Sequence, residues 1–340
     1  MPELSPRTAV CAGYMPLDII DGGDQVWRRA GGTAGNVAAI LAFLGWNSAL
    51  AGRIGDDEAG SELISDLRHA GVDCGMLQHD AGAPTNRLVH RIGATHHRYV
   101  YTCPNCNRRM PRSRPLMLSQ LEKIFETIPS PDVYFFDRAN VATVQLAERY
   151  AAAGALVVFE PSTPANARLL QRALAAATIV KSSDEHGPAP DEIGSPPPPD
   201  QLRVVTEGAG GVRFRLGRGS WRRLAAYAAP AIVDAAGAGD WMTAAIIDAL
   251  ADAASISTDA LDGALKVGQS LASLNCRLPG ARALVEGRTR SEVLTLAARL
   301  REQDEDVHIQ AAPIDVPVPT QTCTWCLLPV ATGASAVALG

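Results

Sequence analysis

The chain is short of aromatic residues, of net basic charge and of long apolar runs. Aromatic side chains make up 5% of the 340 residues, and 31 Lys and Arg residues stand against 36 Asp and Glu residues, a formal net charge of −5. Without a basic stripe, the counterion release that drives nucleic-acid binding has no source, so we expect no nucleic-acid partner. No apolar run approaches the roughly 20 residues of a membrane span, and the start MPELSPRTAVCAGYM lacks a signal-peptide pattern. We therefore expect a cytoplasmic protein with no membrane partner.

What the chain does have is the composition of a globular protein. Hydrophobic residues make up 47% and charged residues 20% of the sequence, which allows a large core in one large domain or two smaller ones. There are seven cysteines. Under reducing conditions this number favours free thiols or metal ligands over a disulfide framework.

Short apolar runs alternate with helical patterns along most of the chain. The runs, rich in Val and Ile, predict buried strands at 7–15, 49–55, 131–137, 155–161, 177–183 and 202–208. Apolar residues at helical spacing predict helices at 35–46, 60–71, 139–154, 164–177, 239–254, 259–276 and 291–303. This alternation predicts an α/β fold, a doubly wound and mostly parallel sheet flanked by helices.

One segment breaks this rhythm. Residues 85–103, TNRLVHRIGATHHRYVYTC, alternate with a period of two around a Gly-Ala turn, which predicts an inserted β-hairpin. We expect this hairpin to be a small β lid. The predicted organisation is one α/β domain over 1–302 with 85–103 as its lid, followed by a C-terminal extension over 303–340.

Gly237, Ala238, Gly239 and Asp240 stand directly before an apolar helical pattern, in VDAAGAGDWMTAAIIDAL at 233–250. In a doubly wound sheet, helix N-termini at the carboxyl ends of strands point N–H groups at ligands, and glycines let the backbone approach a phosphate. An acid at such a place either caps the helix or accepts a proton. The four residues alone favour the cap.

Five further motifs stand in order between about residue 8 and about residue 300. They are Gly31 and Gly32 followed by Asn36, then GRIGDDEAG, KSSDE, TEGAGG and CRLPGA. Together with VDAAGAGD, this series resembles the PfkB (ribokinase-like) family of carbohydrate and nucleoside kinases. The resemblance implies a ribokinase-like fold and an ATP-dependent kinase that phosphorylates a hydroxyl of a sugar or nucleoside.

The resemblance also implies how the glycines and the acid divide the chemistry. Asp240 matches the general base that deprotonates the acceptor hydroxyl, and the backbone of 236–239, which includes Ala236, matches the anion hole. Phosphoryl transfer suits this division because its catalysis consists mostly of positioning and of stabilising charge around in-line oxygens. In the family context, the base replaces the cap as our prediction for Asp240.

Other residues match the nucleotide side of the family. Glu185 matches the end of a motif that supports magnesium through water, although Ser182 stands where the family usually has Asn, and a solvated acidic turn is the alternative. The implied cofactors are ATP and Mg²⁺. Thr206, Gly208 and Gly211 match a loop over the phosphates, and a plain β-turn is the alternative. Asn275, Gly280 and Ala281 match positions that flank adenine.

On the acceptor side, Asp18 matches an acid that binds substrate hydroxyls, and Gly32 and Asn36 match the substrate-facing turn. Carboxylate and amide groups suit a neutral polyol because each buried hydroxyl needs a partner. The alternatives are a loop acid for Asp18 and a helix N-cap for Asn36. Since lids of this family often pair between subunits, the resemblance also implies a homodimer through the lid.

The sequence departs from the family pattern in its second signature. Ala235 and Ala236 follow Asp234 where the family commonly has Thr, which removes hydroxyls that could touch phosphate. A catalytically weak or inactive member, binding a sugar or nucleoside as a regulatory or assembly subunit, is therefore the second function to consider. A dinucleotide-dependent oxidoreductase is a poor third, because no GxGxxG follows the first strand.

Cysteine spacing gives a prediction that owes nothing to the family. Cys103 and Cys106 form CPNC just after the hairpin, and Cys323 and Cys326 form CTWC near the C-terminus. Two such pairs can supply four thiolates to one tetrahedral zinc ion, which would tie the C-terminal extension to the base of the lid. A redox pair and four unligated thiols are the alternatives. We expect a closed, structural Zn²⁺ site without a catalytic role.

Overall fold

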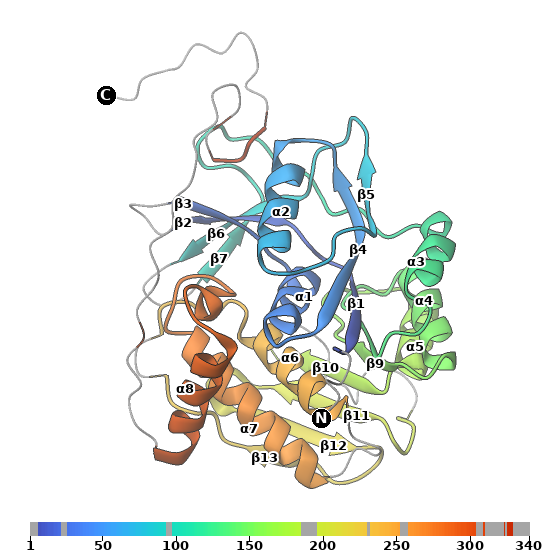
Figure 1. Ribbon diagram of the computed structural model, residues 1–340, viewed down its shortest axis with the longest axis vertical. Helices are drawn as coiled ribbons and strands as arrows, with labels where there is room; N and C mark the ends of the chain where they lie inside the picture. The colour runs from blue at the N-terminus through green and yellow to red at the C-terminus, as the bar shows by residue number, and fades with distance from the viewer. Residues whose placement is uncertain are drawn as a thin grey trace.

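The computed structural model describes residues 6–21, 26–92, 97–184, 196–229, 232–251, 258–303, 309, 323 and 325–328. These residues form two sheets and the helices that cover them (Figure 1). Glu185 and the Gly-Ala turn of the hairpin lie outside the described residues. Within the described residues, no helix is both long enough and apolar enough to cross a membrane.

The large sheet has nine strands in the order β13-β12-β11-β10-β9-β8-β1-β4-β5. The strands from β11 to β5 pair in parallel, and the antiparallel pairs lie at one edge, where β12 pairs antiparallel with both β11 and β13. This confirms the predicted mostly parallel sheet. Their bounds are β1 Thr8–Ala12, β4 Asn47–Gly55, β5 Leu77–Asp80, β8 Val133–Phe136, β9 Leu156–Phe159, β10 Ile179–Ser183, β11 Leu202–Thr206, β12 Val212–Leu216 and β13 Arg222–Leu224.

Helices cover both faces of this sheet, which is why its central strands read as continuous apolar runs. In β1, Ala9 and Cys11 face the core beneath α1 and α6, whereas Val10 and Ala12 face the core beneath α4 and α5. In Figure 1, α3 to α5 lie on the opposite side of the sheet from α6 to α8. The helices are α1 Thr33–Phe43, α2 Glu58–His69, α3 Leu121–Thr127, α4 Val141–Ala152, α5 Ala167–Ala176, α6 Ala238–Leu250, α7 Thr258–Asn275 and α8 Arg290–Gln303.

The second sheet has four strands in the order β3-β2-β6-β7 and is called the lid sheet below. The predicted hairpin is present as β6, Arg87–Ile92, paired antiparallel with β7, His97–Val100. The sequence did not predict its other half, β2 Leu17–Asp21 and β3 Val26–Ala30. Strand β2 pairs in parallel with β6, so the lid sheet joins the segment that follows β1 to the inserted hairpin.

Candidate functional site

The site lies where the carboxyl ends of β8, β9 and β10 meet the first turn of α6. Lys181 of β10 is buried and donates from Nζ to Oε1 of Glu160 at 2.5 Å, and Thr243 of α6 donates to the other oxygen of Glu160 at 2.7 Å. A Cβ atom added to Gly239 would lie 3.3 Å from the Lys181 ammonium. The buried Lys181 and its partner Glu160 therefore contact the first turn of α6 through Gly239 and Thr243.

Helix α6 begins at a glycine for a steric reason. Gly237 is the N-cap and has φ 78°, and a Cβ atom added there would lie 2.3 Å from the carbonyl oxygen of Ala281. No side chain caps this N-terminus, so its first N–H groups are placed to bind an anion. Asp240 is the third helical residue, and the alternative that it caps the helix is therefore wrong.

Asp234 and Asn275 hold the loop that leads into α6. Asp234 accepts from the N–H groups of Ala236 and Gly280, each at 2.9 Å. Burial alone would raise the pKa of Asp234, but His90 and these N–H groups outweigh burial and lower it. Asn275 is fully buried and donates to the carbonyls of Ala236 and Gly280. The structure thus brings three of the predicted nucleotide-side residues together, with the Asn275 amide group bound to backbone.

Asp240 and Asn36, which are far apart in sequence, are hydrogen-bonded. The Asn36 amide nitrogen donates to Oδ2 of Asp240 at 2.7 Å, and Asp240 is 8% exposed. Burial first, and then the charge of Glu160, raise the pKa of Asp240 to about 7, whereas the bond from Asn36 acts in the opposite direction. A carboxylate with such a pKa can take a proton near neutral pH.

Asp18 lies on strand β2 and not in a loop, so the loop-acid alternative is wrong. Its Oδ1 is out of contact with solvent and has no hydrogen-bond partner among the described residues, and burial raises its pKa to about 7. A Cβ atom on Gly31 would meet the Asp18 carboxylate at 1.9 Å. Gly32, with φ 73°, is the N-cap of α1, so Asn36 is not that cap. The side-chain oxygen Oδ1 of Asn36 also lacks a partner in the described chain.

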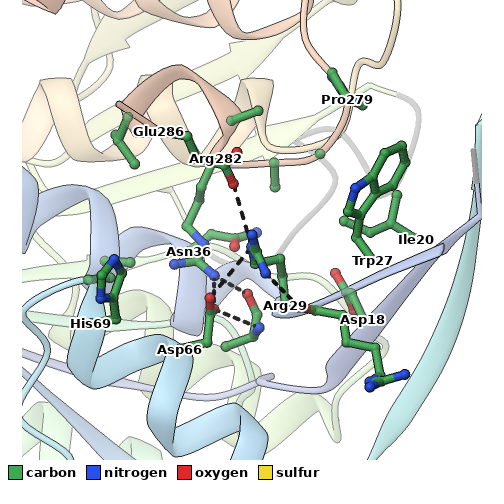
Figure 2. A pocket seen from close by; sticks show the side chains of 18 of the residues that line it. Asp18, Ile20, Trp27, Arg29, Asn36, Asp66, His69, Pro279, Arg282 and Glu286 are labelled. Atoms are coloured by element: carbon green, nitrogen blue, oxygen red, sulfur yellow. Dashed lines mark hydrogen bonds and ion pairs between the residues drawn. The ribbon is translucent and has the colours of Figure 1, made fainter. Parts of the chain in front are cut away.

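A cavity of about 590 Å³ lies between the lid sheet, α1, α2 and the loop 279–287. Asp18 and Asn36 line it, so two predicted acceptor-side residues share one pocket (Figure 2). Sequence reasoning missed eight other polar side chains in its wall, because they are spread over four separate segments. These are Arg28, Arg29, Glu62, Asp66, His69, His90, Arg282 and Glu286.

The arginines of this wall are bound to carboxylates. Arg282 donates to Asp66 at 2.5 Å and to the carbonyl of Ala30 at 2.6 Å, and Figure 2 shows these side chains converging. Arg29 lies 3.6 Å from Asp66 and 3.5 Å from Glu286. A third arginine, Arg28, pairs with Glu62 at 2.7 Å. The positive charges of the cavity wall are therefore compensated.

Tyr99 of the lid sheet is a further residue that the sequence did not single out. Tyr99 is 41% exposed, but desolvation of its phenol, and after it the charges of Asp18, Asp234 and Asp240, raise its pKa. Its ring lies 5.1 Å from that of His90, centroid to centroid. The signal in the sequence was only the period-two alternation, which does not tell which face of a hairpin meets the site.

The remaining nucleotide-side residues lie at the end of β11. Thr206 ends this strand and donates weakly to the carbonyl of Ser182 at 3.4 Å. Gly208 opens a 3₁₀ turn, and Gly211 follows it with φ 97°, where a Cβ atom would lie 2.1 Å from the carbonyl of Leu224. In place of the β-turn that was the alternative at this point, the chain forms a short 3₁₀ turn whose residues have little or no side chain. The structural role of Glu185 lies outside the described residues.

The four cysteines of the two pairs converge. Their sulfur atoms all lie within 4.8 Å of one another, with Cys103 and Cys323 at 3.9 Å and Cys106 and Cys326 at 3.6 Å. None of them forms a disulfide. This group, called the four-cysteine cluster below, is what the spacing predicted, and it lies beside the lid sheet and apart from Asp240.

Comparison with known proteins gives one family over most of the chain. Residues 11–186 and 198–287 match the family described as pfkB family carbohydrate kinase. Fructokinase-1 of Oryza sativa subsp. japonica is 30% identical over 142 residues, which cover 40% of this chain and 42% of the rice protein. Probable fructokinase-6, chloroplastic, of Arabidopsis thaliana is 25% identical over 308 residues, which cover 80% and 78% of the two chains.

Solved structures agree in fold. A fructokinase from Vibrio cholerae O395, with fructose, ADP and calcium bound, superposes with a TM-score of 0.68 at 22% identity, over 86% of this chain and all of that one. Aminoimidazole riboside kinase from Salmonella enterica superposes with a TM-score of 0.65 at 19% identity, over 86% and 100%. At these identities the likeness concerns the fold alone, and it confirms the predicted ribokinase-like architecture.

Proposed function

This chain belongs to the pfkB family of carbohydrate kinases, and we propose that it transfers a phosphoryl group from ATP to a hydroxyl of a neutral sugar or nucleoside. The observation that carries the proposal is the hydrogen bond from Asn36 to Asp240. It joins a residue that lines the cavity to a carboxylate whose pKa is raised to about 7. A base with a pKa near neutral pH beside a pocket suits proton transfer from an acceptor hydroxyl.

In this proposal Asp240 is the general base. Its carboxylate accepts the proton of the acceptor hydroxyl as that oxygen attacks the phosphoryl group. Asn36, by donating to Oδ2, fixes the orientation of the carboxylate and leaves the other oxygen for the substrate. The unpartnered oxygens of Asp18 and Asn36 accept hydrogen bonds from further acceptor hydroxyls, which removes the cost of leaving them buried and unpaired.

The anion hole in this proposal is the uncapped first turn of α6. Within the turn 236–239, the N–H groups of Gly237 and Gly239 and the positive end of the helix dipole stabilise charge on the transferring phosphoryl group. The N–H of Ala236 already donates to Asp234, and that of Ala238 donates to the carbonyl of Ala235. Thr206, Gly208 and Gly211 border the phosphates of ATP, and Asn275 and Gly280 hold the loop that flanks the adenine.

Magnesium fits the carboxylates of this edge. Burial first, with the charge of Glu160 acting in the same direction, raises the pKa of Asp137 to about 6, and burial followed by the charges of Glu160 and Asp137 raises that of Asp240 to about 7. Carboxylates crowded in this way are stabilised by a hard divalent cation, which prefers oxygen ligands. When bound, Mg²⁺ neutralises charge on the phosphate oxygens. We keep Glu185 as its further support through water.

The acceptor is neutral in this proposal because the cavity already balances its own charge. Arg28, Arg29 and Arg282 are each bound to a carboxylate of the wall, so a phosphorylated acceptor would find no arginine without an acidic partner among the described lining residues. The similarity to fructokinases makes D-fructose the first acceptor to assay.

Three further parts of the proposal lie outside catalysis. The four-cysteine cluster holds a structural Zn²⁺ ion, and because four thiolates leave no open coordination position, it has no part in phosphoryl transfer. A homodimer through the lid and a cytoplasmic location stay predictions. Sedimentation at micromolar protein concentration decides the first: a monomer alone would remove the dimer.

The test of the function is a screen with a turnover measurement. Thermal shift is recorded with D-fructose, D-ribose, adenosine and D-fructose 6-phosphate, and each hit is assayed for ADP release with Mg²⁺-ATP. We expect stabilisation and turnover with a neutral acceptor and neither with the phosphorylated sugar. Stabilisation by a sugar without ADP release would favour the catalytically inactive subunit, for which Ala235 and Ala236 are the sequence signal.

A further inference from the structure

The lid sheet has two faces with different neighbours. Asp18, Ile20 and His90 line the cavity from one face. Ile19 and Val89, which are paired across β2 and β6, project to the other face and pack against the four-cysteine cluster. Successive residues of a strand point to opposite faces, so the cluster lies directly behind the strands that carry the acceptor-side residues.

The two cysteine pairs adopt the same local turn. In the first pair the N–H of Asn107 donates to the carbonyl of Cys103, and in the second the N–H of Leu327 donates to the carbonyl of Cys323, each at 2.9 Å. Asn107 has φ 54° and Leu327 has φ 55°, and they are the two non-glycine residues with left-handed φ in the described parts of the chain. For a leucine this conformation is costly, so its recurrence points to a shared constraint on the two turns.

The spacing of the four sulfur atoms suits one tetrahedral ion. Zinc with four thiolates at about 2.3 Å places neighbouring sulfurs about 3.8 Å apart. The measured separations of 3.9 Å and 3.6 Å are close to this value and much longer than the roughly 2.05 Å of a disulfide. The side-chain amide of Asn105 also donates to the sulfur of Cys323 at 3.2 Å, an interaction that stabilises a thiolate.

A buried arginine connects the cluster to the lid and to α2. Arg87, the first residue of β6, is fully buried, and its guanidinium donates to the carbonyl of Cys326 and to the carboxylate of Asp57. Asp57 is the N-cap of α2 and accepts from the hydroxyl of Thr85. A buried guanidinium must keep its partners, because losing one leaves an uncompensated charge.

Helix α2 continues this connection into the cavity. Asp66, two turns along α2, accepts from the backbone N–H of Ala30 on β3 and from the guanidinium of Arg282. The cluster, the first residue of β6, α2 and the cavity wall are therefore joined by direct hydrogen bonds, each between groups that are at least partly buried.

We infer that zinc in the four-cysteine cluster acts as a clamp: it fastens residues 323 and 325–328 to the outer face of the lid sheet and thereby fixes the lid over the acceptor cavity. Binding of the ion holds the carbonyl of Cys326 on the guanidinium of Arg87. This contact keeps β6 and the start of α2 in fixed positions relative to each other. Without the ion the four sulfurs have no common bond, and the segment can leave the lid. The effect on acceptor affinity rests on the proposed kinase function, whereas the effects on metal content and lid mobility do not.

Metal content gives the first test. Protein purified without chelator is analysed for metal as wild type, as Cys323→Ser/Cys326→Ser, and as the matched control Cys74→Ser, whose thiol is also buried but packs in the main core and not in the cluster. We expect about one zinc per chain in wild type and control and none in the double variant. Absence of zinc from wild type, zinc retained in the double variant, or disulfides in place of free thiols would each overturn the inference.

Lid mobility gives the second test and needs no substrate. Hydrogen exchange of β6 and β7 is compared in wild type with zinc and after removal of zinc by a chelator, with β8 of the large sheet as internal reference. We expect exchange in the lid strands to become at least about tenfold faster while β8 is unchanged. Equal exchange with and without zinc would leave the ion no clamping role and overturn the inference.

The third test separates the link from the metal. Arg87→Lys keeps a positive charge for Asp57 but cannot bind Asp57 and the carbonyl of Cys326 together as the guanidinium fork does. We expect this variant to retain zinc, to show the faster lid exchange, and to raise KM for the best acceptor of the screen with little change in kcat. If no acceptor turns over, the proposed function fails, and zinc content and exchange still decide the clamp. Normal lid exchange in Arg87→Lys would overturn it.

Discussion

Replacing Asp240 by asparagine tests the proposed base and the physical reason for its pKa together. Asparagine has the same size and can still bond to Asn36, so the cavity and the start of α6 keep their shape. The variant lacks only the ability to take a proton. We expect turnover to fall by roughly 10²- to 10⁴-fold, the range attributed to general-base catalysis, while the affinity for ATP changes little.

The same variant should have a higher free energy of unfolding than wild type at alkaline pH, and the pKa shift of Asp240 sets an upper limit to the increase. The pKa of Asp240 is raised from 3.8 to about 7, so its ionisation in the folded protein is unfavourable and the stability it contributes is lost as the pH rises from about 4 to about 7. The difference of about three pH units corresponds to at most about 4 kcal/mol. Because asparagine does not ionise, Asp240→Asn should be the more stable protein at pH 8, and the two should be equal near pH 4.

The assays are ADP release at saturating acceptor and urea unfolding at pH 4 and pH 8. The matched control is Asp248→Asn, the same change in the same helix, where the carboxylate accepts from Trp46 at the far end of α6 and should affect turnover little. A variant that keeps more than a tenth of the wild-type rate, or one that is less stable than wild type at pH 8, would refute the assignment of Asp240 as a buried base.

Three further predictions concern the same edge of the sheet. The acid limb of kcat/KM should report the pKa of about 7 of Asp240, falling about tenfold per pH unit below it, and a pH-independent rate between pH 5 and 8 would contradict this. Gly237→Ala should lower the free energy of unfolding by about 1–3 kcal/mol in urea titrations, because its φ is 78° and its Cβ would strike Ala281, whereas Gly263→Ala, with open space in α7, should raise it by about 0.5–1 kcal/mol. Lys181→Met should lower the free energy of unfolding by about 3–5 kcal/mol, because Glu160 loses the partner of its charge. It should also move the acid limb of kcat/KM to higher pH, since the charge of Lys181 lowers the pKa of Asp240. An unchanged acid limb would show that the charge of Lys181 does not affect Asp240.

The six consecutive strands from β11 to β4 were predictable because they are buried on both faces, whereas the partly exposed strands β5, β12 and β13 were not predicted. All six predicted strands and all seven predicted helices are present within a few residues of their expected bounds. Strands β2 and β3 were missed because their sequences, LDIID and VWRRA, carry charged residues that face the cavity or pair there, such as Asp18 and Arg29. Such strands have neither the continuous apolar run nor the alternation that the other strands show.

The predicted site residues were found through motifs, and the missed ones have none. Asp18, Asn36 and Asp240 stand in recognisable short patterns, and the structure brings Asn36 and Asp240 into direct contact. Arg282, Asp66 and His90 belong to three elements that meet only after the lid sheet and α2 have packed. The four cysteines were predictable because the CxxC spacing is itself a signal of a metal site. This spacing does not reveal that Arg87 binds the carbonyl of Cys326.

The contact between the two cysteine pairs spans 220 residues of chain, and this separation sets an order of events during synthesis. At about 5–20 residues per second, about 11–44 s pass between the emergence of Cys103 from the ribosome and that of Cys323. Throughout this time the first pair is an open dithiol, and the guanidinium of Arg87 lacks the carbonyl that it binds in the finished protein. In every chain that stops short of residue 326, the outer face of the lid sheet therefore lacks the contacts of Cys323 and Cys326. The lid sheet reaches its final packing only after synthesis has passed this point.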